Sequence, residues 1–78
     1  MTDWQIIVTA DRVNSALSVV HALDRVVGLS RDNALAAADR MREEGLAAIS
    51  SPSQQAAEST VARLRGYGLD ASVAWSES

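Results

Sequence analysis

The stretch that decides the fold runs from residue 28 to residue 45 and reads GLSRDNALAAADRMREEG. It predicts a helix with defined ends: Ser30 offers an N-cap oxygen, Asp32 puts a negative charge in the first turn, and Gly45 ends the helix. The apolar positions between these ends are mostly alanine, so a neighbouring helix can approach closely. We expect an inner face made of Ala34, Leu35, Ala37, Ala38 and Met41.

The residues before this stretch predict another helix, which ends at Gly28, where a left-handed glycine is favoured. Asn14 or Ser15 can cap its first turn. Valine lowers intrinsic helix propensity, so packing must hold this helix in place. The residues that recur at helical spacing are Val19, Val20, Leu23, Val26 and Val27.

Three segments are rich in strand-forming residues, namely Trp4–Thr9, Leu46–Ile49 and Leu69–Trp75. In the first, Ile6 and Val8 point to one face while Ile7 points to the other, as is typical of a central strand. The last segment alternates between apolar and small or polar residues, which predicts a strand that is half buried.

A third helix is expected between the last two strands. Ser51 followed by Pro52 predicts its start, with Ser53 as the rival N-cap. Glycines at positions 66 and 68 end it. Its predicted buried stripe consists of Ala57, Val61 and Leu64.

The expected order is therefore β-α-α-β-α-β within one domain, residues 1–78. We expect an α+β fold in which a three-stranded antiparallel or mixed sheet carries three helices on one face, the economical arrangement for a short chain.

Composition excludes several kinds of function. There is no cysteine and only one histidine, so neither a metal site nor another cofactor is expected. The net charge of −3 argues against nucleic acid as a partner. No apolar run approaches the roughly 20 residues of a membrane span. A cytoplasmic protein without a membrane contact is the natural expectation.

Four segments have a characteristic spacing: the strand Trp4–Val8, the turn at residues 28–30, the helix end Arg42–Gly45, and the segment Ala57–Val61. With this spacing the chain resembles the ClpS family, small adaptors that deliver substrates to the Clp unfoldase and protease. The C-terminal domain of the ribosomal stalk protein is similar in architecture. The stalk protein's helix-borne lysines, which meet elongation factors, have no counterpart here.

In the ClpS family an Asn-Asp-Asp loop and a histidine grip a substrate's free α-amino group, because an ammonium needs acceptors and negative charge around it. Here the loop positions are Ala10, Asp11 and Arg12, and the histidine position is Arg42. Losing one hydrogen bond to a charged group costs about 1.5–3 kcal/mol. The resemblance therefore implies that amine recognition is lost or badly weakened, and that the two arginines favour an acidic or carboxylate-bearing group.

The resemblance places the family's side-chain pocket on four apolar residues of the two helices. Ordinary core packing of the same residues is the alternative. The candidate residues for binding a protein or peptide partner are Asp11, Arg12, Asn14, Ala16, Val19, Ala38, Met41 and Arg42.

A second surface is implied by Glu58, which matches the family acid that docks on the N-terminal domain of a Clp-type AAA+ unfoldase. Thr60 stands where the family has a lysine, so only half of that ion-pair interface remains. The alternative is a solvated helix residue.

The leading hypothesis is a non-enzymatic peptide-binding adaptor that resembles ClpS and has largely lost the amine site. One alternative is an N-degron adaptor with altered specificity. Another is a structural or regulatory subunit that forms a homodimer through an open sheet face bearing Trp4 and Trp75, with packing of both rings in the core as the simpler reading. An enzyme is not expected, because no nucleophile and orienting acid accompany His21.

Overall fold

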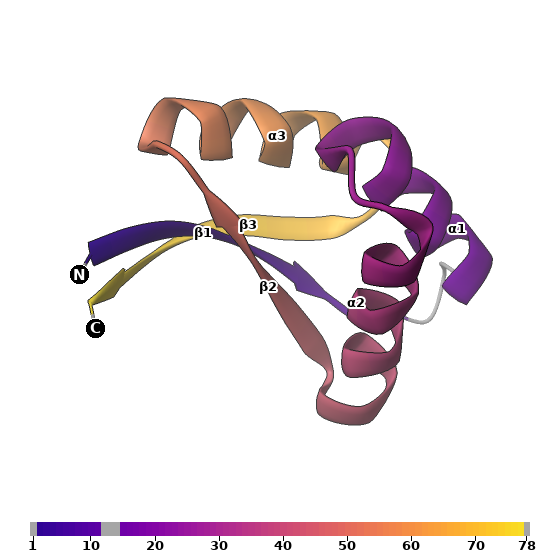
Figure 1. Ribbon diagram of the computed structural model, residues 1–78. Coiled ribbons are helices and arrows are strands. Elements are labelled where there is room, and N and C mark those ends of the chain that lie inside the picture. The colour runs from indigo at the N-terminus through magenta and orange to yellow at the C-terminus, as the bar shows by residue number, and fades with distance from the viewer. Residues whose placement is uncertain (1, 12–14, 78) are drawn as a thin grey trace.

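The apolar run near the start of the chain forms the central strand of the sheet. The computed structural model describes residues 2–11 and 15–77. Strand β1 (Thr2–Thr9) pairs antiparallel with both β2 (Leu46–Ser51) and β3 (Asp70–Glu77), which gives the order β2-β1-β3. The two ends of the chain lie side by side at one end of the sheet (Figure 1). The central position of β1 agrees with the apolar residues on both of its faces.

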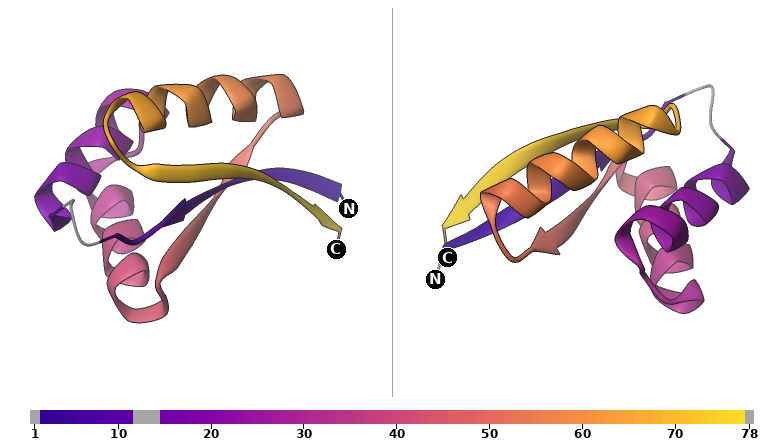
Figure 2. Two further views of the ribbon diagram at one scale, coloured as in Figure 1. Left: turned by 180° about the vertical axis from the view of Figure 1, so that it is seen from behind. Right: turned by 90° about the horizontal axis from the view of Figure 1, so that it is seen from above.

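Four helical elements accompany the sheet in the described residues, and the predicted β-α-α-β-α-β order is confirmed. They are α1 (Ala16–Ala22), the π-helical turn η1 (Leu23–Val27), α2 (Arg31–Glu44) and α3 (Gln54–Gly66). Helix α3 lies along β1 and β3, while α1 and α2 pack against each other and α2 also contacts β2 (Figure 2). All sheet pairing among the described residues is antiparallel, within the α+β class.

One face of the sheet is covered by helices. Ile6 and Val8 are buried on this face, together with Ala47 and Ala71 of the flanking strands, whereas Ile7 on the opposite face is only partly buried. The buried stripe expected on α3 is confirmed, since Ala57, Val61 and Leu64 all belong to the core.

Helix α2 faces the core through fewer residues than expected. Ala34, Ala38 and Met41 are buried, but Leu35 is 45% exposed. The expectation for Leu35 was wrong because consecutive helical residues diverge by about 100°. A face centred on Ala34 and Ala38 therefore turns Leu35 outward.

The second half of the first helix is wider than an α-helix. The Leu23 carbonyl accepts hydrogen bonds from the amides of Gly28 at 3.1 Å and Leu29 at 3.4 Å. The turn ends at Gly28, whose φ is 80°. The expected C-terminal glycine is thus confirmed, although one continuous α-helix was expected before it.

Serine side chains cap all three α-helices. Ser15, Ser30 and Ser53 each accept a hydrogen bond from the amide three residues later, at 3.3, 3.2 and 3.1 Å. The expectation of Ser51 as the cap of α3 was wrong, and its rival Ser53 takes that place. Ser51 instead continues β2 and pairs with Trp4.

A matched pair of glycine substitutions tests the role of backbone conformation at the helix ends. Gly45 has a φ of 86°, and a Cβ there would meet nothing within 4 Å. Gly45→Ala should therefore lower the free energy of unfolding by about 1–2 kcal/mol through the left-handed backbone alone. Gly66 lies in helix α3 with equal space, so Gly66→Ala should raise it by about 0.5–1 kcal/mol. Urea unfolding of both variants measures the difference; equal effects would contradict the argument.

Candidate functional site

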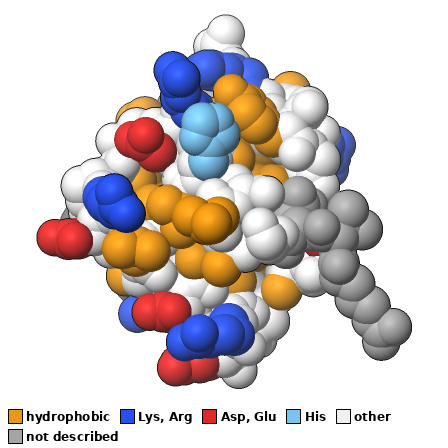
Figure 3. Space-filling model, turned by 90° about the vertical axis from the view of Figure 1, so that its right-hand side faces the viewer, with side chains coloured by type: hydrophobic (Ala, Val, Ile, Leu, Met, Phe, Trp, Pro, Cys, Tyr) orange, Lys and Arg blue, Asp and Glu red, His pale blue; other side chains and the backbone are white. Residues whose placement is uncertain are grey.

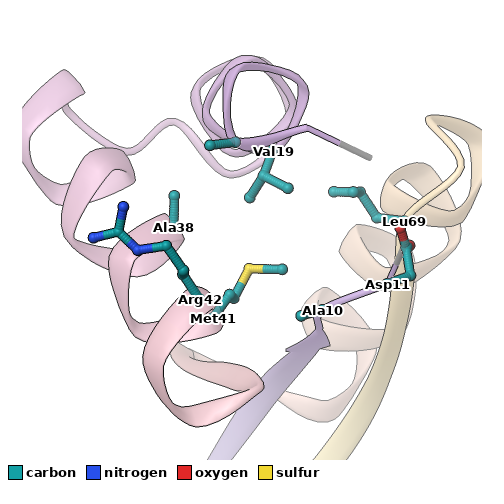
Figure 4. A pocket seen from close by; sticks show the side chains of 8 residues that line it. Ala10, Asp11, Val19, Ala38, Met41, Arg42 and Leu69 are labelled. Carbon is teal, nitrogen blue, oxygen red and sulfur yellow. The ribbon is translucent and has the colours of Figure 1, made fainter. Parts of the chain in front are cut away.

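A hollow of about 240 Å³ lies where the end of β1 meets α1, α2 and the start of β3 (Figure 4). Its volume is below the roughly 300–1,000 Å³ of pockets for drug-sized ligands, and it suits a single amino-acid side chain. The lining residues are Ala10, Asp11, Ala16, Val19, Ala38, Met41, Arg42 and Leu69.

Backbone contacts at Gly45 bring the walls of the hollow together. The Ala10 amide donates to the Gly45 carbonyl at 2.8 Å, and the Gly45 amide donates to the Met41 carbonyl at 2.9 Å. The end of β1 is thereby held beside the last turn of α2. Asp11 follows directly after Ala10. It lines the hollow and is exposed, so it lies at the mouth of the hollow.

The interior of the hollow is apolar. Val19 of α1, Met41 of α2 and Leu69, which directly precedes β3, point toward one another across the space, with Ala38 beside them (Figure 4). All four are buried in the structure. Ala16 also lines the hollow but is exposed, which places it at the rim.

The charges at the rim consist of one acid and one arginine that is already paired. The Arg42 guanidinium lies 3.1 Å from Asp39 Oδ1, one turn earlier on α2, and the two side chains are 75% and 63% exposed. Figure 4 shows this guanidinium directed along the flank of α2, away from the centre of the hollow. Asp39 therefore offsets part of the charge that Arg42 brings to the rim.

The structure brings together six of the eight residues predicted for the binding site: Asp11, Ala16, Val19, Ala38, Met41 and Arg42. Arg12 and Asn14 lie outside the described residues. The ion pair between Asp39 and Arg42 was missed, although its i, i+3 spacing is a known signal.

Two lining residues were absent from the predicted set: Leu69 was not considered, and Ala10 was named only as a position of the loop at the amine site. Thr9 of β1 pairs with Asp70 of β3, so Ala10 and Leu69 are brought together where these strands meet the helices. Pairing the first strand with the last would have supplied the missing signal.

Glu58 lies on α3, away from the hollow. Its carboxylate is exposed and accepts a hydrogen bond from the side-chain amide of Gln54 at 3.3 Å. This exposure agrees equally with a docking residue and with a solvated helix residue.

The tryptophans do not form a patch on the open face of the sheet. Trp4 lies directly opposite Trp75, with ring centroids 4.6 Å apart in an edge-on arrangement. Trp4 shares its strand face with buried Ile6 and packs against the core, so both rings lie on the helix-covered side. Trp75 remains 47% exposed near the end of the sheet. The idea that the two rings mark the open face was therefore wrong.

No metal-binding arrangement is found among residues 2–11 and 15–77. His21 is exposed on α1, between apolar and charged side chains (Figure 3), and its ring lies 6.3 Å from that of Tyr67. No group of three or more His, Asp or Glu side chains that could hold a metal ion occurs in the described part of the chain. The helices found there are all too short or too polar to span a membrane.

Comparison with known proteins gives one family. A search of curated proteins gave no match. The model of the family described as ATP-dependent Clp protease adaptor protein ClpS matches residues 1–72 of the 78. The chain therefore belongs to the ClpS family of Clp protease adaptors.

Proposed function

We propose that this protein is a non-enzymatic, cytoplasmic adaptor that holds one side chain of a peptide or protein substrate in the hollow and presents that substrate to a Clp-type AAA+ unfoldase. The observation that carries the proposal is the convergence of apolar side chains from separate elements on a space that remains open. A plain core would have closed over such a space, because protein interiors pack to high density.

The rim supports recognition of a substrate by its side chain more than by its α-amino group. Asp11 is the only carboxylate that lines the hollow in the described residues. Arg42 offers donors and no acceptor, so it cannot bind an ammonium. It can bind a carboxylate on the substrate by exchanging its exposed partner Asp39.

Acetylation of the substrate should therefore have little effect. We expect a labelled peptide that begins with Leu and its N-acetylated twin to bind with dissociation constants within about threefold of each other. The reason is that, with fewer acceptors at the rim, the free amine contributes little to the binding free energy. Fluorescence anisotropy measures both affinities. Loss of about tenfold or more on acetylation would instead identify an N-degron adaptor that still uses the amine.

Filling the rim should block the hollow. Ala16 lines it and is exposed, so Ala16→Phe adds bulk without disturbing the core. We expect the affinity for the same peptides to fall by about tenfold or more, because the incoming side chain is excluded. Ala62→Phe, at an exposed position on α3, is the matched control and should bind normally. Equal binding by both variants would place the peptide elsewhere.

The proposed contact with the unfoldase is made by Glu58. Glu58→Arg should weaken binding to the isolated N-terminal domain of a Clp unfoldase by about fivefold at low salt, the size expected for one exposed charge pair. Calorimetric titration measures this affinity. Glu43→Arg changes an exposed charge on α2 and serves as the control. If both reversals act equally, the effect comes from net charge and not from a contact of Glu58.

A further inference from the structure

A second groove, separate from the hollow, runs between α2 and the outer strand β2. Its volume is about 310 Å³. One wall consists of Ala47, Ala48, Ile49 and Ser50 of β2; the other consists of Leu29, which precedes α2, and of Asn33, Ala36, Ala37 and Arg40 on α2.

The lining shows that this groove follows the edge of the strand. Residues 47–50 are consecutive, so their side chains point alternately to the two faces of the sheet. A groove on either face would touch every second residue only. Contact with all four places it along the backbone edge, where the amide and carbonyl groups of β2 that do not bond to β1 are directed.

The sequence of β2 lacks the charged residues and prolines that often protect an outer strand, although α2 stands beside its edge across the groove. Strand β2 reads LAAISS and contains no charged residue or proline. Such residues commonly prevent an exposed edge strand from pairing with another chain. The other outer strand, β3, begins with the charged residue Asp70. In addition, Arg65 Nε donates a hydrogen bond to the Ala71 carbonyl at 3.0 Å.

The α2 wall has small side chains in the middle and one cation. Ala36 and Ala37 leave room for an extended chain beside the strand, while Leu29 and Ile49 are partly buried and offer apolar surface. Arg40 is exposed and makes no ion pair within the part of the chain that the structure describes. No carboxylate lines the groove to oppose its charge.

From these features we propose that the groove, which we call the β2 edge groove, binds an extended segment of a partner protein. The segment adds to the sheet as a fourth strand beside β2. It inserts an aliphatic side chain between Leu29 and Ile49, and a carboxylate of the segment pairs with Arg40. Main-chain hydrogen bonds supply affinity in such strand addition, and the alternating side-chain positions supply specificity.

A single extended strand fits this groove better than a second copy of the protein. Helix α2 stands beside β2 and forms the second wall. Two copies that joined at their β2 edges would bring two α2 helices, each with its own Arg40, into the same space. Pairing between copies is therefore disfavoured by both bulk and charge.

The groove is independent of the hollow assigned to substrate. Helix α2 separates them: Ala38, Met41 and Arg42 line the hollow, whereas Ala36 and Arg40 line the groove. A substrate side chain in the hollow and a strand beside β2 can be bound at the same time.

The test uses the whole protein and a positional-scanning library of hexapeptides that are acetylated at the N-terminus and amidated at the C-terminus, so that neither terminus contributes a charge. We expect pools with an aliphatic residue and Asp or Glu two or more positions apart to bind, and the bound pool to slow hydrogen exchange at amides of residues 47–50. Arg40→Glu should lower affinity for the acidic pools by about tenfold, and Ala36→Trp should abolish it.

Matched variants make the result decisive. Arg63→Glu and Ala62→Trp change exposed residues on α3 and should bind the pools normally, as should Ala16→Phe, which blocks only the hollow. The proposal is overturned if no pool protects residues 47–50, or if Ala36→Trp binds as well as Ala62→Trp. A different result would be slower hydrogen exchange at these amides when the protein concentration rises without peptide, together with a dimer in sedimentation. That result would overturn the proposal and show that a second copy of the protein binds the edge.

Discussion

The hydrogen bond from the Ala10 amide to the Gly45 carbonyl is the contact on which the arrangement of helices and sheet depends. Gly45 adopts a φ of 86°, which few other residues tolerate, and so turns the chain from α2 directly into β2. Its carbonyl then reaches the end of β1. Because β1 also pairs with β3, one backbone contact sets Met41 of α2 opposite Leu69 and creates the hollow between them.

Helix α2 stands between two recesses, and its alanines explain why both exist. Ala38 borders the hollow, whereas Ala36 and Ala37 border the groove beside β2, so small side chains leave space on both sides of the helix. Alanine at these positions also limits the apolar surface that α2 buries. A domain of 78 residues buries little apolar surface and has a small free energy of unfolding. Unfilled space lowers that free energy further, which suggests that the two recesses have a function.

The sequence predicted the order of elements because its signals are local: serine caps, glycines at helix ends and alternation along strands. It failed where tertiary contacts decide. The exposure of Leu35 depends on how α2 is rotated against the core, and the choice of Ser53 over Ser51 depends on how far β2 pairs with β1. Most of the hollow followed from likeness to a family, whereas Leu69 required knowledge of which strands are neighbours.

The ion pair between Asp39 and Arg42 changes the physical account of selectivity at the hollow. From the sequence, Arg42 appears as a cation that repels an ammonium. In the structure Asp39 offsets that charge, so long-range repulsion is weak and is further screened by salt. What remains is that the Arg42 side chain itself offers no acceptor, a short-range effect that salt does not screen. An exposed pair of this kind contributes only about 0–1 kcal/mol, so a substrate carboxylate can replace Asp39 at small cost. Under the proposed function, the mouth of the hollow would therefore discriminate through hydrogen-bonding capacity rather than through net charge.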